Sequence, residues 1–189
     1  TGRSLVSVLE SDKNGMVDAS RNWVITGRER HVARAREGML PYPQRALRTP
    51  DYLYIINFKP ARWPMGDPNN ITADTAPNFN TLANNTFITF GDLDASPTKA
   101  WLIGKRNEPK WKWHYNYAFG KRPREELFIL KSDPDQIKNV ADNPKYAAIK
   151  KKLNAQLMAE LKRTGDPRVT GDGSTFDKLP FAGDFRRSR

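Results

Sequence analysis

His31 stands among arginines in a short charged segment, and this grouping is the strongest candidate for chemistry in the sequence. The segment 27–38 contains Arg28, Arg30, Arg34 and Arg36 on either side of the histidine. Guanidinium groups bind sulfate, phosphate and carboxylate through paired hydrogen bonds. Loops between rigid strands often carry such binding residues. The segment therefore predicts a loop that binds an anion.

No arrangement typical of a catalytic centre is visible in the sequence. His31 and His114 are the only histidines, and cysteine is absent. The chain therefore lacks a His-x-x-x-His pair, and it also lacks a glycine-rich phosphate loop and a serine elbow motif. Glu125 and Glu126 are adjacent in a predicted strand, so they point to opposite faces and do not form an acid–base pair.

The second histidine lies in an aromatic segment, Trp111-Lys-Trp-His-Tyr115. Rings at this density most often pack in a core, and packing is the interpretation that the pattern favours. Stacking on sugar rings or on nucleic-acid bases is the alternative, because an exposed indole offers a flat face to either.

The charge balance favours anionic partners. Of the 189 residues, 32 are Lys or Arg and 21 are Asp or Glu, which gives a formal net charge of +11. Such a chain suits nucleic acid, sulfated or phosphorylated substrates, or anionic headgroups, although an ordinary solvated basic surface is equally compatible. The cations are dispersed and zinc-finger spacing is absent, so nucleic-acid binding rests on charge alone.

Membrane and targeting segments are not expected. No apolar run approaches the roughly 20 residues that a membrane-spanning helix needs. The start of the chain, Thr1-Gly-Arg-Ser-Leu-Val6, lacks the apolar stretch of a signal peptide. The absence of cysteine excludes disulfides and thiolate metal sites.

Local patterns predict an α+β fold. Residues 22–26 read as a strand buried on both faces, 42–48 and 52–58 as a β-hairpin, and 126–130 as a further strand. Residues 59–97 read as a long ordered loop, and Ser96 with Pro97 as the start of a short helix. We expect a small antiparallel sheet of three or four strands, long irregular loops, and a long C-terminal helix packed on one face of the sheet.

The long helix has the clearest signals. Asn143 and Pro144 suit the N-cap and first helical positions, and Gly165 with Pro167 suits the end. An apolar stripe recurs at three- and four-residue spacing, formed by Tyr146, Ile149, Leu153, Leu157 and Leu161. Lys150, Lys151 and Lys152 are interpreted as the solvated side of this helix.

Five segments, taken in order, resemble the C-terminal portion of the type I sulfatases of the alkaline phosphatase-like superfamily. They are Gly2–Leu9, the Arg-His segment, Tyr42–Phe58, Arg62-Trp-Pro64, and Glu126–Pro144, which begins Glu-Leu-Phe-Ile-Leu-Lys-Ser-Asp-Pro-Asp. The combination is most similar to the heparan N-sulfatase (sulfamidase)-like branch. The match covers most of residues 1–168, followed by a polar tail at 169–189.

The resemblance also implies what the chain does not carry. Sulfatases form a formylglycine nucleophile from the first residue of a Cys/Ser-x-Pro-x-Arg motif and hold calcium with Asp and Asn side chains. The nearest match here, Ser132-Asp-Pro134, has Gln136 where arginine is required. No catalytic residue, metal site or cofactor is therefore expected in this chain. Formylglycine and calcium are expected in a missing N-terminal catalytic domain.

The resemblance implies that this chain contributes residues that bind the substrate. His31 is expected to face the sulfated sugar, and Arg28, Arg30 and Arg45 are candidates for contacts to sulfate or uronate. Residues 1–40 are expected to pack on the missing catalytic domain, followed by the hairpin 41–58, the loop 59–97, and the strand and helix of 126–164. The whole protein is expected to be secreted or periplasmic.

Other interpretations stay open at this stage. The chain suits a free-standing basic module that binds glycosaminoglycan or nucleic acid, and it also suits a scaffold that assembles with a separately encoded catalytic chain. Without a partner sheet, the apolar strand 22–26 is expected to pair with a second copy and form a weak homodimer.

Overall fold

The computed structural model describes residues 2–178, which group into two compact units. The first, here called the sheet unit, contains the residues up to Gly27 together with 45–56 and 125–173. The second, called the loop unit, contains 28–44, 57–124 and the residues from Ser174. Residues 179–189 of the predicted polar tail lie outside the described residues.

The sheet unit confirms the predicted antiparallel sheet. Its strands are β1 (Val24–Arg28), β2 (Gln44–Arg48), β3 (Tyr52–Asn57) and β4 (Glu125–Ile129), in that spatial order. The turn of the β2–β3 hairpin is closed by hydrogen bonds between Thr49 and Tyr52. β3 and β4 are antiparallel, with Tyr54 opposite Leu127. Together with the helices, this sheet confirms the α+β class.

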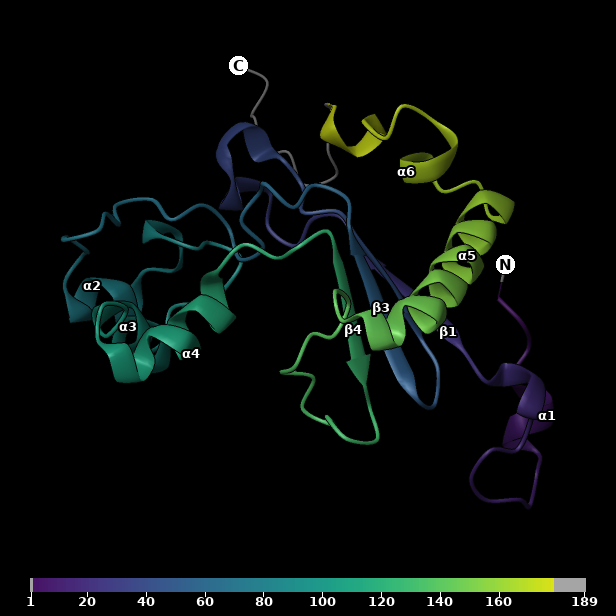
Figure 1. Cartoon of the computed structure of the whole chain (residues 1–189). Coiled ribbons are helices and arrows are strands. Elements are labelled where there is room, and N and C mark those ends of the chain that lie inside the picture. Colours follow the sequence, from purple (N-terminus) through teal and green to yellow (C-terminus); the bar gives the residue numbers. More distant parts are fainter. Residues whose placement is uncertain (1, 179–189) are drawn as a thin grey trace. The chain divides into compact units, whose positions relative to one another are not determined.

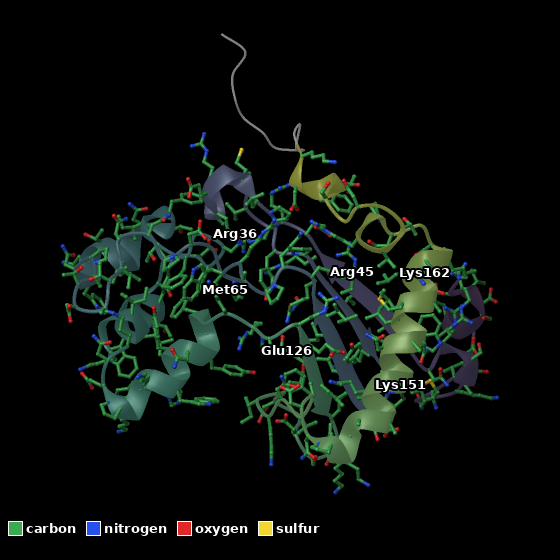
Figure 2. All side chains as sticks on the ribbon, turned by 45° about the horizontal axis from the view of Figure 1, so that its top comes forward. Arg36, Arg45, Met65, Glu126, Lys151 and Lys162 are labelled. Carbon is green, nitrogen blue, oxygen red and sulfur yellow. The ribbon has the colours of Figure 1, made fainter. Side chains whose placement is uncertain are left out.

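The long helix α5 (Ala147–Arg163) packs on the face of the sheet that carries Tyr54. Asn154 Nδ2 donates a hydrogen bond to the Tyr54 hydroxyl at 2.8 Å, which joins helix to strand across the interface. Leu153, Leu157 and Leu161 are buried as the stripe predicts. Figure 1 shows α5 running along the sheet, and in Figure 2 the side chains of Lys151 and Lys162 point away from it, as the solvated side should.

Both ends of this helix follow the sequence signals. Asn143 caps a short turn, η5 (Pro144–Tyr146), that leads into α5. At the other end Gly165 adopts φ +72°, and the N–H groups of Gly165 and Asp166 donate to the carbonyls of Lys162 and Leu161. This pattern is a Schellman motif, which favours glycine because other residues are strained at positive φ.

The expectation that residues 22–26 are buried on both faces is wrong. β1 begins at Val24 and occupies the outer position of the sheet, so only β2 pairs with it. Val24 is 51% exposed and Trp23 is 38% exposed. An edge strand whose faces are uncovered leaves backbone groups and apolar side chains in water. Pairing with a second copy through this edge stays a prediction.

The other edge of the sheet is covered by the chain itself. The Asn139 side chain accepts a hydrogen bond from Leu127 N at 2.9 Å, and Val140 N donates to Leu127 O at 2.9 Å. Asp133 forms the preceding turn by accepting from the backbone N–H groups of Ile137 and Lys138. Asp133 is therefore a turn-forming residue.

The loop unit contains three helices around an aromatic core: α2 (Phe79–Asn84), α3 (Pro97–Gly104) and α4 (Pro109–Phe119). Ser96 caps α3 and Pro97 is its first residue, as predicted. The segment 59–97 is ordered, but α2 and the turn η4 (Thr86–Ile88) interrupt the predicted loop. Phe90 and Phe119 stack at 4.6 Å between ring centroids in the core.

Lys99 is fully buried and holds the turn before α3 together. Its ammonium group donates to the carbonyl oxygens of Thr86, Phe90 and Leu93 at 3.1, 3.2 and 2.7 Å. Burial lowers the pKa of Lys99, and nearby Asp94 opposes this shift. A buried ammonium is tolerated when its three donors are satisfied, and here each has an acceptor.

The remaining elements are short. They are α1 (Val6–Leu9), η1 (Ala19–Arg21), η2 (Ala33–Ala35), η3 (Glu37–Met39), α6 (Pro167–Thr170) and η6 (Thr175–Asp177). Arg62 fixes η6 within the loop unit, because its Nη2 lies 2.5 Å from Asp177 Oδ2. Among the described residues, no helix is long and apolar enough to cross a membrane.

Leu157→Asp is expected to destabilise the sheet unit severely. Losing a buried leucine costs about 2–5 kcal/mol, and burying an unpaired carboxylate costs more. The melting temperature should fall by at least about 5 °C. Ala155→Asp is the matched control, since Ala155 is exposed on the same helix. Equal small shifts in both variants would show that the stripe is not buried.

Lys99→Met is expected to destabilise the loop unit, because it removes the ammonium donor from three carbonyl oxygens in a buried site. Phe90 O keeps a hydrogen bond from Leu93 N, and the carbonyls of Thr86 and Leu93 lose the donor that Lys99 supplies. Each unsatisfied buried group costs about 1–3 kcal/mol, so a loss of about 2–4 kcal/mol is expected in chemical denaturation. Lys105→Met removes only a surface pair with Glu108, and such pairs contribute roughly 0–1 kcal/mol. A loss no larger than that of Lys105→Met would contradict the structural role of Lys99.

Candidate functional site

The charged segment predicted from the sequence is organised around a buried carboxylate, that of Asp92. The Asp92 side chain is 1% exposed. Arg36 Nη2 donates to Asp92 Oδ2, and Val32 N donates to Asp92 Oδ1 at 3.0 Å. A buried carboxylate is stable only when a cation and hydrogen bonds compensate it. Asp92 therefore fixes the course of the loop that contains His31.

Arg36 links segments of the protein through intramolecular hydrogen bonds and is not available to a ligand. Its guanidinium also donates to Trp63 O through Nε and to Pro64 O through Nη2, each at 2.7 Å. Its side chain is almost fully buried. The Arg36 guanidinium donates to backbone carbonyls and to the Asp92 carboxylate. It thereby joins the loop to residues 63–64 and to Asp92.

Arg28 shares the same carboxylate from a more exposed position. Its Nη2 donates to Pro64 O at 2.7 Å and lies 4.0 Å from Asp92 Oδ2. Burial lowers the pKa of Arg28; Asp92 opposes the shift and Arg36 adds to it. An arginine stays protonated in spite of such a shift, so two guanidinium charges face one carboxylate. Arg28 thus shares the Asp92 carboxylate with Arg36 and also donates to Pro64 O.

His31 stands at the solvent side of this group. Its side chain is 64% exposed, and Nδ1 lies 4.0 Å from Asp92 Oδ1. The imidazole is therefore accessible to a ligand, while the loop beneath it is held by Val32 N on Asp92. Exposed His31 and half-buried Arg28 together form an edge over the buried ion pair, in which Arg28 is the cation; we call it the His31 edge.

Tyr42 lies beneath the two guanidinium groups. Arg28 Cζ and Arg36 Cζ are 6.0 and 5.8 Å from the centre of the buried Tyr42 ring. Both distances are within the range of a cation–π attraction. The Tyr42 backbone N–H donates to Glu29 O at 2.7 Å, which returns the chain to the start of the loop.

The backbone that presents Asp92 requires a glycine. Gly66 has φ +96°, and a Cβ at this position would lie 2.7 Å from both Ala35 O and Gly91 N. The close approach is fixed by hydrogen bonds from Asp67 N to Ala35 O, from Phe90 N to Asp67 O and from Asp92 N to Met65 O. Any larger residue at 66 would push the segment that carries Asp92 away from the loop.

The other two predicted substrate-binding arginines are placed elsewhere. Arg30 donates to Met39 O at 2.9 Å and to Phe176 O at 3.2 Å within the loop unit. Arg45 belongs to the sheet unit, where Nε and Nη2 bind the Asp166 carboxylate at 2.6 and 3.2 Å. The structure thus brings together His31 and Arg28, and it gives Arg30 and Arg45 intramolecular partners.

Two members of the group were not among the predicted site residues. Arg36 lies inside the predicted loop but was not distinguished from its neighbours. Asp92 lies in Gly91-Asp-Leu-Asp94, where no spacing or motif marks it. The only signal for it was chemical: a cluster of arginines needs an acidic partner, and that requirement does not say which one.

A metal centre does not fit these residues. Among residues 2–178, no group of three His, Asp or Glu side chains could hold a metal ion. Asp92, the carboxylate at the centre of the site, is taken by arginine. Calcium and formylglycine in another part of the protein stay predictions, and nothing in this site depends on them.

Comparisons with known proteins support the sulfatase resemblance. A 76-residue segment is 36% identical to an ulvan-active sulfatase from Formosa agariphila, covering 40% of this chain and 12% of that protein. A crystal structure of a candidate sulfatase from Bacteroides thetaiotaomicron aligns with 95% of this chain and 24% of its own, at 18% identity and a TM-score of 0.46. A TM-score below 0.5 does not establish a shared fold.

No protein-family model matches the chain. The similarity to sulfatases therefore rests on the 76 residues matched to the Formosa sulfatase. The chain spans far less than two thirds of this relative and of the aligned structure. Over the matched residues the chain is similar to a sulfatase, which is consistent with the resemblance of its motifs to the C-terminal portion of such enzymes.

Proposed function

We propose that this chain is the substrate-binding part of a sulfatase that acts on a sulfated sugar. The observation that carries the proposal is the cationic edge of His31 and Arg28 above the buried Asp92–Arg36 pair. The edge is exposed, positively charged and held rigidly, which suits an anionic group of the substrate. The relationship to sulfatases makes sulfate the anion of choice.

The proposed role is orientation and charge complementarity. His31 would donate a hydrogen bond to a sulfate or sugar oxygen, and Arg28 would supply the nearby positive charge. Because the ion pair beneath them is already formed, little reorganisation is needed when the ligand binds. Arg30 and Arg45 would contribute only by releasing their present acceptors, so we rank them below His31 and Arg28.

The hydrolytic step itself is assigned to other residues of the protein. The sequence has no Cys/Ser-x-Pro-x-Arg motif, and the described residues form no metal site. Formylglycine and calcium would be supplied by a catalytic part that carries that motif, in a secreted or periplasmic protein. The Formosa relative is named for activity on ulvan, which supports a sulfated sugar as the substrate. Preference for an N-sulfate follows only from the sulfamidase-like motifs.

The 189-residue chain alone is expected to hydrolyse no sulfate ester. It lacks the nucleophile motif, so added calcium should not help. The measurement is release of sulfate from an aryl sulfate and from a sulfated disaccharide, against a buffer blank. Hydrolysis above the blank would show that the chain carries a nucleophile of its own.

His31→Ala is expected to weaken binding of a sulfated disaccharide by roughly ten- to hundredfold, the effect of losing one hydrogen bond to a charged group. Binding is followed by NMR shift changes on the whole chain at low salt, with the desulfated disaccharide as ligand control. Lys151→Ala, an exposed cation on α5, is the matched protein control.

The two controls separate a site from general charge attraction. Equal weakening by His31→Ala and Lys151→Ala would indicate nonspecific attraction to a basic surface. Unchanged affinity in a folded His31→Ala variant would remove His31 from the proposed site.

A further inference from the structure

A continuous row of aromatic rings lies on the surface of α4 and the neighbouring α3. Adjacent ring centres are 4.6 to 5.3 Å apart from one ring to the next. We call this row the aromatic ridge; its members are Trp101, Trp111, His114, Trp113 and Tyr117. The sequence pattern favours packing for the segment Trp111–Tyr115. In the structure, one face of α4 is packed and another face is exposed.

The packed face of α4 is formed by other residues. Tyr115 and Phe119 turn toward Phe90, in contact with the core of the loop unit. Trp113 and Tyr117, two residues before each of these, lie on a different side of the helix. Trp113 is 51% exposed and Trp101 is 38% exposed. The core therefore does not account for the ridge.

Cations accompany the ridge along its length. Lys110 Nζ lies 4.7 Å from the centre of the Trp111 ring, and Arg122 Cζ lies 4.9 Å from that of Tyr117. Lys112 is exposed on the same helix. The helix itself, Pro109–Phe119, contains no acidic residue. Flat apolar faces bordered by positive charge are complementary to sugar rings that carry sulfate or carboxylate groups.

We propose that the aromatic ridge binds an anionic polysaccharide chain, at a place distinct from the His31 edge. The rings would stack on the apolar faces of successive sugars, and Lys110 and Arg122, which lie over rings of the ridge, would contact their anionic groups. An 11-residue helix is about 16 Å long, which accommodates a short stretch of such a chain. The ridge would hold a polymer while other residues act on one sugar.

The preference for polysaccharide over single-stranded nucleic acid rests on the proposed function, since bases also stack on exposed aromatic rings. The test therefore compares heparin and hyaluronan with neutral dextran and an oligothymidylate. Binding to the whole chain is measured by affinity electrophoresis and by tryptophan fluorescence. Heparin and hyaluronan are expected to bind, and dextran weakly or not at all.

Trp113→Ala is expected to weaken heparin binding about tenfold, because it removes the most exposed stacking face. Trp23→Ala is the matched control, since Trp23 is exposed to the same degree as Trp101 but lies in the sheet unit. Its effect on binding should be less than about twofold, because it removes no ring of the ridge. Lys110→Ala tests the charge of the ridge, because exposed Lys110 lies over the Trp111 ring, and it keeps the test valid if Trp113→Ala does not fold.

The outcomes separate this proposal from the proposed function. Because heparin is sulfated and can also contact the His31 edge, the ridge variants are compared in the His31→Ala background, where Trp113→Ala should still weaken heparin binding about tenfold. Trp113→Ala alone should leave binding of a sulfated disaccharide to the His31 edge unchanged. A heparin affinity that neither Trp113→Ala nor Lys110→Ala changes in the His31→Ala background overturns the ridge proposal alone. Tighter binding of oligothymidylate with the same dependence on Trp113 overturns it in favour of a nucleic-acid surface. Loss of self-association in Trp113→Ala, measured by sedimentation with no effect on heparin, overturns it in favour of an interface between copies.

Discussion

The ion pair between Asp92 and Arg36 is the constraint on which the candidate site depends. A carboxylate this deeply buried costs several kcal/mol in desolvation, so it persists only with a cation and further donors around it. Arg36 supplies the cation and Val32 N a donor. In meeting this requirement, the chain joins three segments that have no regular secondary structure in common: the His31 loop, residues 63–64 and residues 90–92. Removing either charge would leave the other buried without its partner, and the three segments would then be joined mainly by backbone hydrogen bonds such as those from Asp67 N to Ala35 O and from Asp92 N to Met65 O. The exposed position of His31 is therefore a consequence of the Asp92–Arg36 ion pair beneath it. His31 itself contributes little to that ion pair.

The same principle explains how the rest of the loop unit stays ordered with few strands. Backbone carbonyls that no helix or sheet satisfies must find other donors. Lys99 serves three of them from inside the unit, and Arg36 serves two more in addition to Asp92. Long basic side chains thus take the place of a hydrogen-bonded ladder in the segment 59–97. The aromatic core buries apolar surface, and the cations donate hydrogen bonds to the backbone carbonyls. Neither would be enough for a segment so rich in proline.

The helices and turns that are determined by neighbouring residues could be predicted from the sequence. Features that depend on contacts with residues far along the chain could not. The hairpin, the Ser96 cap and the long helix with its glycine end follow from residues within a few positions of each other. The exposure of β1 depends on its place at the edge of the sheet, which only the spatial strand order decides. The site divides in the same way. The composition of the 28–36 segment marks it as a binding loop, yet Asp92, its organising residue, is far along the chain and carries no motif. Arg45 was a substrate-contact candidate from the family resemblance, and Asp166, whose carboxylate it binds, is 121 positions further along the chain.

A net charge of +11 consequently says less about ligand binding than the acceptors of each cation do. Arg36, Lys99 and Arg45 are basic residues whose donors are directed at the protein's own oxygen atoms. Each would have to break those hydrogen bonds before it could meet a sulfate, and the free energy lost would be comparable to that of the new hydrogen bonds. Lys110 and Arg122 instead lie over aromatic rings. Arg122 gives one donor to Tyr117 O, and a cation over a ring face keeps its other N–H donors available to an anion. His31 is similarly open, with its nearest carboxylate at 4.0 Å. The positions where anions should bind are therefore those at which positive charge meets water or an aromatic face, and in this chain these positions are the His31 edge and the aromatic ridge.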